Sequence, residues 1–302
     1  MQRLAWIGAS LLLIVGCRSA PPGSIAPSGP DANSAETRAI ARDFMHLQYE
    51  EKNLKGAKAK YYTPDFIQHN PEIANGVHGD QKFIDARQQR DPAHYLPIDQ
   101  WVNKIDHLLV DGKLFAIHHR LYTSPEDRGR VFMDIWRVEN GKMVEHWDVI
   151  QGIPDEAKNA NTMWGDLSAG AAPAPDDPSP EAVIRGYLDL GLTQNNPGAA
   201  AEKYIADDFR QHSPHIADGK AALVEYFKRR TADPNSPARS SYVSHILSDA
   251  DLVLVLRHVV NGPEDRGVMY ADLFRVRRGK IVEHWDVIQA VPDKSVNGNT
   301  MW

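Results

Sequence analysis

The chain has little cysteine, few long apolar stretches and no excess of positive charge. Cys17 is its only cysteine, so no disulfide bond can form within one chain. The apolar run from Leu4 to Val15 is shorter than the roughly 20 residues that a membrane-spanning helix needs. The net charge of −6 argues against a nucleic-acid partner.

The amino-terminal segment has the features of a targeting signal. Arg3 precedes the apolar run, which ends in Ile14-Val15-Gly16-Cys17. This ending resembles the bacterial lipobox, which predicts a signal peptide over residues 1–17, lipidation of Cys17 and a lipid-anchored position in the cell envelope, facing the periplasm or in the outer membrane. A plain secretory signal with an incidental cysteine is the alternative. Residues 18–33 are rich in Pro, Ser, Gly and Ala and predict a flexible tether.

A long internal repeat is the clearest feature of the sequence. The segment Gly141–Trp164 is identical to Gly279–Trp302 at 17 of 24 positions. The offset of 138 residues holds back to His107 and His245, and an offset of 143 aligns the earlier parts. A repeat of this length indicates duplicated domains, since solenoid repeats run about 20–50 residues. We predict domain 1 over residues 34–164, a Pro/Ala linker over 165–178 and domain 2 over 179–302.

Hydrophobic periodicity predicts the same α+β architecture in each copy. In copy 1, helical spacing appears from Ser34 to Tyr49, over 54–61 and over 78–90, followed by strand patterns over 101–110, 113–122, 130–138 and 142–151. Helices followed by an antiparallel meander predict a curved antiparallel sheet packed on about three N-terminal helices.

The turn between the last two strands decides which side chains share a face. Copy 1 has Asn140-Gly141, which suits a two-residue type I′ loop, but copy 2 has Arg278-Gly279, and Arg is unfavourable at positive φ. We therefore predict a three-residue loop with a bulge, which pairs Asp134 with His146 and Phe132 with Asp148. A plain two-residue loop would place Asp134 and Asp148 on opposite faces.

This register gathers acids, imidazoles and aromatic rings on one face of each sheet. A carboxylate that is buried beside a second carboxylate has a raised pKa and suits proton transfer next to a carbonyl. The loops Gln68–Pro71 and Gln211–Pro214 add one histidine each. The candidate catalytic residues are Asp134, His146, Asp148 and His69 in copy 1, and Asp272, His284, Asp286 and His212 in copy 2. We expect the cavities to be lined by Phe132, Trp136 and His118 in copy 1 and by Tyr270, Phe274 and His258 in copy 2.

Two other interpretations of these residues stay open. The Asp–His pair is also compatible with a structural hydrogen bond on a solvated face. A set of His69, Asp134, His146 and Asp148 has the mixed ligands that suit zinc or iron, although nothing in the spacing is diagnostic and we predict no metal site.

With these motifs, the chain resembles the SnoaL-like polyketide cyclases of the nuclear transport factor 2-like superfamily, and within it a bacterial group of predicted aldol-condensation enzymes. The resemblance covers both copies and is strongest at Gln68–Pro71, Asp134–Arg137, Glu145–Gln151 and the Asn-Thr-Met-Trp ends. It implies two cone-like barrels with apolar cavities, no metal or organic cofactor, and a general base at Asp148 and Asp286. It also implies pairing through the sheets, which two copies in one chain could achieve as an intramolecular pseudo-dimer.

The chain departs from that family at one position, since a cyclase histidine on the preceding strand corresponds to Asp134 and Asp272. We expect His146 or His69, or their copy-2 counterparts, to stabilise an enolate oxygen instead. The predicted function is proton abstraction next to a carbonyl of a small apolar substrate. The alternative is a non-catalytic envelope lipoprotein that binds a small ligand or a protein through its cavities.

Overall fold

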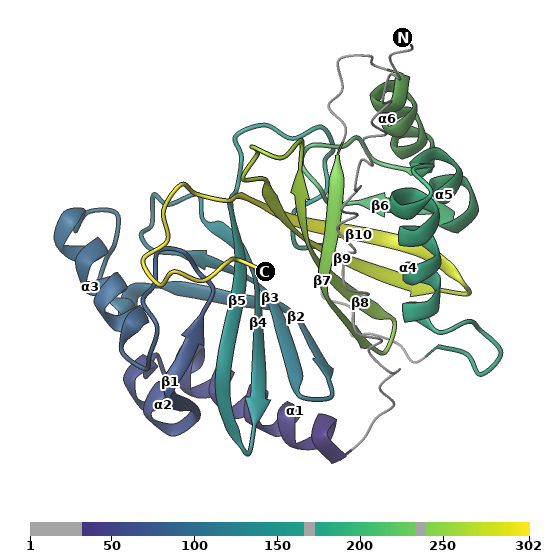
Figure 1. Ribbon diagram of the computed structural model, residues 1–302. Coiled ribbons are helices and arrows are strands. Elements are labelled where there is room, and N and C mark those ends of the chain that lie inside the picture. Colours follow the sequence, from purple (N-terminus) through teal and green to yellow (C-terminus); the bar gives the residue numbers. More distant parts are fainter. Residues whose placement is uncertain (1–31, 166–172, 233–238) are drawn as a thin grey trace, which may run out of the picture.

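The computed structural model describes residues 32–165, 173–232 and 239–302, which form two domains of the same architecture (Figure 1). The predicted signal peptide over residues 1–17, Cys17, all but the end of the tether and residues 166–172 of the linker lie outside the described residues. In the described parts, none of the helices combines the length and the apolar character that crossing a bilayer requires.

Each domain places helices before and between the strands of a five-stranded sheet. Domain 1 contains α1 (Ala32–Met45), a π-helical turn (His46–Glu50), α2 (Leu54–Tyr61), β1 (Tyr62–Gln68), α3 (Gly79–Arg90), β2 (Val102–Asp111), β3 (Leu114–Tyr122), β4 (Arg130–Glu139) and β5 (Lys142–Gly152). Domain 2 contains α4 (Pro180–Leu188), a π-helical turn (Asp189–Thr193), α5 (Pro197–Tyr204), β6 (Ile205–Gln211), α6 (Lys220–Ala232), β7 (Ser240–Asp249), β8 (Leu252–Val260), β9 (Val268–Arg277) and β10 (Lys280–Ala290).

The sheets are mixed, because a parallel edge strand that was not predicted from the sequence joins the four predicted antiparallel strands. The strand order is β1-β5-β4-β3-β2 in domain 1 and β6-β10-β9-β8-β7 in domain 2. The first strand of each sheet runs parallel to the last, as β1 does to β5. β1 contains Pro64, which is tolerated because β1 lies at the edge of the sheet. Neither sheet closes into a barrel, and the two α+β domains are consistent with cone-like folds.

The hairpin between β4 and β5 also differs from its prediction. Asn140 and Gly141 have φ of 50° and 73°, and Arg278 adopts 52°, so both copies use the two-residue loop. A left-handed Arg costs about 1–2 kcal/mol, which the hairpin evidently offsets. A bulge at Val144 then adds one residue to β5, so Asp134 lies opposite Asp148 rather than His146. The loop and the bulge together restore the shared face that the prediction required.

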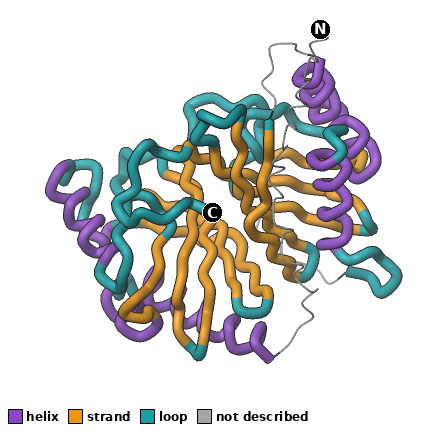
Figure 2. The backbone as a smooth tube through the Cα atoms, in the orientation of Figure 1, coloured by secondary structure: helices purple, strands orange, loops and turns teal. Residues whose placement is uncertain are grey.

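Alternation along the strands gives each sheet two buried faces. In domain 1 one face packs on the helices through an aromatic cluster in which the Phe44 ring lies 5.5 Å from Trp136 and 6.4 Å from Phe115. The other face, with Met133 and Trp147, joins a core that is shared with the sheet of domain 2. The helices therefore lie on the outer flanks, and the two sheets face each other (Figures 1 and 2).

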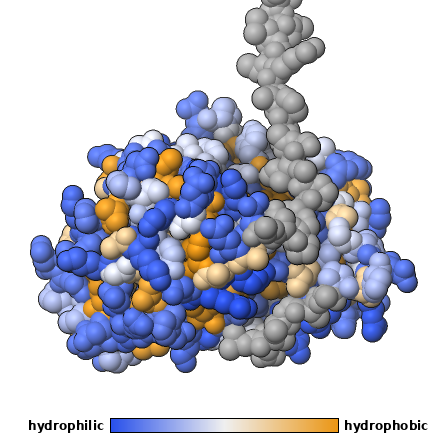
Figure 3. Space-filling view, turned by 90° about the horizontal axis from the view of Figure 1, so that it is seen from below, coloured by the Kyte–Doolittle hydropathy of each residue, from blue (hydrophilic) through white to orange (hydrophobic). Residues whose placement is uncertain are grey.

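The contact between the domains is reciprocal, as expected for an intramolecular pseudo-dimer. The backbone N–H of Ile150 donates to Gln289 Oε1, and that of Ile288 donates to Gln151 Oε1, both at 2.8 Å. The C-terminal tail of domain 2 crosses onto domain 1 (yellow in Figure 1), where Asn299 donates to the backbone carbonyl of Gln68. With the apolar sheet faces buried, the side of the molecule in Figure 3 is largely hydrophilic, with scattered apolar residues.

Trp285 is a direct test of this shared core. It is fully buried and stacks on His212 with ring centroids 4.8 Å apart. We expect Trp285→Ala to lower the free energy of unfolding by about 3–5 kcal/mol, because it removes a large side chain from a close-packed interface. Urea unfolding measures this. The control Tyr242→Ala removes a ring that is 59% exposed and should change stability by less than about 0.5 kcal/mol. Equal effects of the two variants would contradict the shared core.

Candidate functional site

A cavity lies between the helices and the inner sheet face of each domain. Its volume is about 390 Å³ in domain 1 and about 680 Å³ in domain 2. The acid–imidazole–acid groups line these cavities, with Asp134, His146 and Asp148 in domain 1 and Asp272, His284 and Asp286 in domain 2. The four aromatic residues expected there, Phe132, Trp136, Tyr270 and Phe274, line them too.

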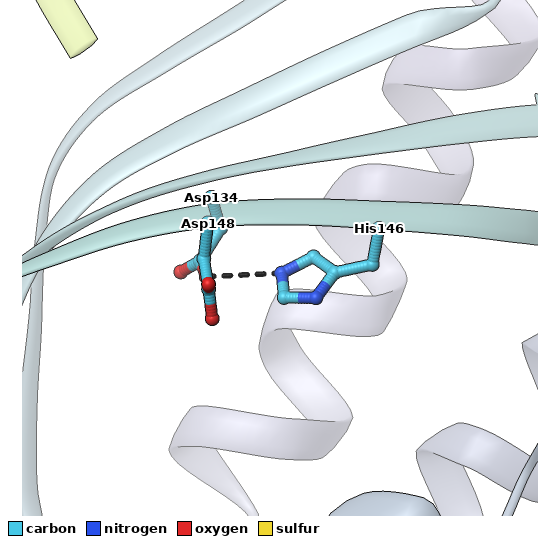
Figure 4. Close-up of side chains that lie close together, drawn as sticks. All are labelled: Asp134, His146 and Asp148. Atoms are coloured by element: carbon cyan, nitrogen blue, oxygen red, sulfur yellow. Dashed lines mark hydrogen bonds and ion pairs between the residues drawn. The ribbon is translucent and has the colours of Figure 1, made fainter. Parts of the chain in front are cut away.

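His146 is held rigidly by hydrogen bonds at both ring nitrogens. Its Nδ1 lies 2.9 Å from Gln68 Oε1, and the same oxygen accepts the backbone N–H of Asn70, so Nδ1 carries a proton. Its Nε2 lies 3.0 Å from Asp134 Oδ1 (Figure 4). The indole of Trp136 stacks on the ring. The imidazole is therefore fixed in orientation and donates from both nitrogens when Asp134 is ionised.

Asp134 lies between two histidines and carries the negative charge of the cluster. Its second oxygen contacts His119 Nε2. Burial alone would raise the pKa of this carboxyl, but the charge and hydrogen bond of His119, together with those of His146, lower it to about 2. The pKa of His146 is raised, because the Asp134 hydrogen bond and the charges of Asp148 and Asp134 outweigh its burial. The proton in the Asp134–His146 contact therefore belongs to the imidazole.

Asp148 is the acid whose pKa shifts in the opposite direction. It lies across the strand pair from Asp134 and is 4% exposed. Burial raises its pKa to about 7 and the charge of Asp134 adds to this, while His146 and Asn70 act against it. The Asn70 amide donates to Asp148 Oδ2 at 2.7 Å. Oδ1 is buried without a hydrogen-bond partner among the described residues, which leaves one oxygen for a ligand in the cavity.

Domain 2 repeats this arrangement, except that an arginine, which stays positively charged, replaces one of the histidines. His284 contacts Gln211 Oε1 and Asp272 Oδ1, both at 3.0 Å. Arg257 takes the place of His119 and donates to Asp272 Oδ2 at 2.5 Å. Burial opposes ionisation of Asp272, but Arg257 and His284 lower its pKa to about 2. Burial raises the pKa of Asp286, and its Oδ1 has no hydrogen-bond partner among the described residues.

His69 and His212 lie away from the cavities, which corrects their expected place beside the acids. Both follow the first strand and lie on the face between the domains. His69 stacks on Trp147, and its ring nitrogens contact Glu145 and the carbonyl of Thr300. His212 makes the equivalent contacts with Trp285, Glu283 and Thr162. Each histidine therefore joins a loop of one domain to the tail that follows the other.

His118 and His258 were also assigned to the wrong face. His118 is fully buried on the interface side, with its Nδ1 3.1 Å from His107 Nδ1. His258 stacks on Trp302 and contacts the carbonyl of Arg266. Strand alternation turns their neighbours inward, so the cavity residues are His119 and Arg257. Phe132 and Asp134 alternate in the same way on β4, and this pattern could have identified both residues from the sequence.

The geometry argues against two hypotheses drawn from the sequence, which are direct donation from the cluster histidines to an enolate and a four-residue metal site. Both ring nitrogens of His146 and of His284 are bonded to protein groups, so neither ring can donate directly to an enolate oxygen without losing a partner. The four-residue metal set is not assembled, because His69 faces the interface. Asp134, His146 and Asp148 still offer ligand atoms within 4.8 Å of one another, as do their copy-2 counterparts.

Comparison with known proteins identifies the family. The model of the SnoaL-like domain matches residues 41–146 and again 184–284, which is more than half of the chain. The chain therefore belongs to the SnoaL-like family and contains two such domains. Among curated proteins, none matches this sequence.

Several solved structures resemble one domain of the chain. An LEH-like epoxide hydrolase of M. tuberculosis is 18% identical, with 38% of this chain and 86% of that one covered and a TM-score of 0.32. TsrD from Streptomyces laurentii is 17% identical, with coverage of 40% and 92% and a TM-score of 0.31. An NTF2-like protein from Burkholderia xenovorans LB400 is 19% identical, with coverage of 38% and 90% and a TM-score of 0.31.

The raised pKa of Asp148 has a measurable effect on stability. An acid whose folded-state pKa is raised stabilises the fold below its unfolded pKa of about 4, and this contribution is lost as pH rises through about 7. Between pH 4.5 and 7.5 we expect the wild type to lose on the order of 2–4 kcal/mol relative to Asp148→Asn, measured by urea unfolding. Asp155→Asn, at a side chain that is 86% exposed, is the control and should follow the wild type. Parallel curves for all three proteins would contradict the assignment.

Proposed function

We propose that the chain is an enzyme that removes a proton from the carbon next to a carbonyl group of a small apolar substrate, in an aldol condensation, cyclisation or isomerisation. The observation that carries this proposal is the unpartnered Oδ1 of Asp148 in a cavity lined by aromatic rings, on an acid whose pKa is about 7. A base with a pKa near the working pH combines a useful ionised fraction with a real affinity for protons.

The proposed step needs only side chains of the protein. The ionised carboxylate of Asp148 takes a proton from the α-carbon and becomes a neutral acid. The electron pair of the broken C–H bond moves onto the carbonyl oxygen as an enolate. The enolate carbon then attacks a second carbonyl, whose oxygen takes the proton back from Asp148, or the enolate regains that proton at another carbon. Asp286 is the corresponding base in domain 2.

The neighbouring charges support this step through space. The hydrogen bonds of His146 place its positive charge beside Asp134 and on the cavity wall, where it offsets negative charge on a bound enolate. The carboxylate of Asp134 keeps His146 protonated and at the same time raises the pKa of Asp148. We therefore assign Asp134 and His146 to charge balance and positioning, and Asp148 to proton transfer.

The second candidate function is ligand binding without chemistry. The cavity of domain 2 supports it, because its volume of about 680 Å³ lies in the range of small-molecule sites. A binding protein would hold a ketone without exchanging its α-protons. The exchange experiment below distinguishes the two functions.

We also propose that the chain is a lipoprotein of the bacterial envelope, anchored through a lipid on Cys17. The support is the apolar run that ends in Val15-Gly16-Cys17. Expression in a bacterium with labelled palmitate should label the wild type and leave Cys17→Ser unlabelled. Equal labelling of both proteins, or of neither, would contradict the anchor.

Exchange of α-protons tests the proposed chemistry without knowledge of the natural substrate. Proton NMR in D₂O measures deuterium uptake at the α-carbon of small apolar ketones such as 2-tetralone. We expect the wild type to accelerate this uptake, with a rate that rises as pH increases through about 7, because Asp148 must be ionised. Asp148→Asn together with Asp286→Asn should lower the rate at least about 100-fold.

Single variants and a control complete this experiment. Asp148→Asn and Asp286→Asn alone show how much each domain contributes. Asp106→Asn, whose carboxyl lies outside the cavity and pairs with Arg120, controls for the loss of a buried acid. Wild-type exchange in the double variant would exclude both aspartates as the base. Ketone binding without exchange in the wild type would favour the binding function.

A further inference from the structure

The two cavities differ in charge at aligned positions of their lining. In domain 1, Arg87 lines the cavity and donates to both oxygens of Glu72, at 2.6 and 2.7 Å. The corresponding residues of domain 2, at the offset of 143, are Arg230 and His215. Arg230 also lines its cavity, but a histidine replaces the acid that neutralises Arg87. Among the described residues, Arg230 has no carboxylate partner.

A second replacement adds another cation at the same cavity. Trp101 lines the cavity of domain 1, and its counterpart at the offset of 138 is Arg239. Arg239 is exposed, lines the cavity of domain 2 and donates to the neutral side chain of Asn261 at 2.9 Å. Within the part of the chain that the structure describes, it forms no ion pair. Two guanidinium groups therefore line the domain 2 cavity without an acidic partner among the described residues.

The inner part of the domain 2 cavity does not neutralise these groups. The acids that line it are Asp272, which already pairs with Arg257, and Asp286, whose pKa is raised by burial. In domain 1 the four cations of the lining, Lys52, Lys58, Arg87 and Arg130, are matched in number by four acids, Glu72, Asp80, Asp134 and Asp148. The described lining of domain 2 has three arginines and two acids, so it carries one more positive charge than negative, whereas the formal charges of the domain 1 lining balance.

The replacements also change the interior of the cavity. Lys58 and Asp80 of domain 1 correspond to Ala201 and Leu223 of domain 2, so a buried ion pair is exchanged for two apolar side chains. This change fits the larger volume, about 680 Å³ against about 390 Å³. The domain 2 cavity is therefore larger, and Arg230 and Arg239 have no acidic partner among the described residues.

We propose that domain 2 binds an anionic ligand, an apolar body that carries a carboxylate, with its anionic end at Arg230 and Arg239 and its body directed toward Asp286. Domain 1 takes a neutral ligand. Guanidinium groups recognise carboxylates through paired N–H donors, which favours this anion. The inference assigns a substrate class to domain 2 and rests on the proposed function for the chemistry at Asp286, but the binding preference does not depend on that chemistry.

A matched pair of probes tests the preference. 2-Naphthylacetate and 2-naphthylacetamide have the same apolar body and differ in charge, and calorimetric titration of the full chain at pH 7.5 and low salt measures both affinities. We expect the carboxylate to bind about tenfold more tightly than the amide, as two partly exposed cations allow. The double variant Arg230→Gln with Arg239→Gln should remove this ratio and leave amide binding within about twofold.

Two further variants locate the effect and separate it from catalysis. Arg87→Gln changes the matched arginine of domain 1 and should leave the ratio unchanged. Asp286→Asn should keep the ratio even though it removes the proposed base, so failure of the catalytic proposal would leave this result intact. Equal affinities of the two probes in the wild type, or a ratio that persists in the Arg230/Arg239 double variant, would overturn the proposal.

Discussion

The two-sided burial of the sheets is the constraint on which the rest of the structure depends. Along β5, successive residues point alternately to the cavity and to the other domain, so His146 and Asp148 face inward while Trp147 and Val149 face the shared core. The bulge at Val144 sets this alternation. A slip of one residue would bury His146 and Asp148 between the sheets and turn Trp147 toward the cavity. Burying the imidazole and the carboxylate without partners would cost a large desolvation free energy. Fold and site are thus fixed by the same register.

The pairing of the domains also explains why the most repetitive part of the sequence contains both the site and the interface. Trp147 and Trp285 fill the shared core, and the tails that end in Trp164 and Trp302 bind the loops that carry His212 and His69. A mutation in this segment therefore affects both the packing between the domains and the geometry of the candidate site. The cavity linings differ more between the two copies, and the replacement of His119 by Arg257 is the clearest case.

Much of the fold could be predicted from the sequence, because strand alternation and helical spacing are strong local signals. The four antiparallel strands of copy 1 and the shared face of Asp134 and Asp148 were expected. The parallel edge strand was not, since Pro64 is unfavourable in most strand positions and is accepted here only because β1 pairs with β5 at the edge of the sheet. The loop at Arg278 was predicted wrongly because arginine disfavours positive φ, yet Arg278 adopts φ of 52° in the two-residue hairpin loop. The place of His69 depends on contacts between the domains, which no local pattern encodes, whereas strand alternation could have shown that His118 points away from the cavity.

The protonation state of Asp148 is the most direct test of this account. Carbon-13 NMR of protein labelled at the aspartate carboxyl carbons, with Asp148→Asn and Asp134→Asn to assign the signals, follows each acid as pH changes. The account predicts that the Asp148 signal titrates near pH 7 and that Asp134 stays ionised down to about pH 2. Titration of Asp148 together with the exposed aspartates, near pH 4, would contradict it.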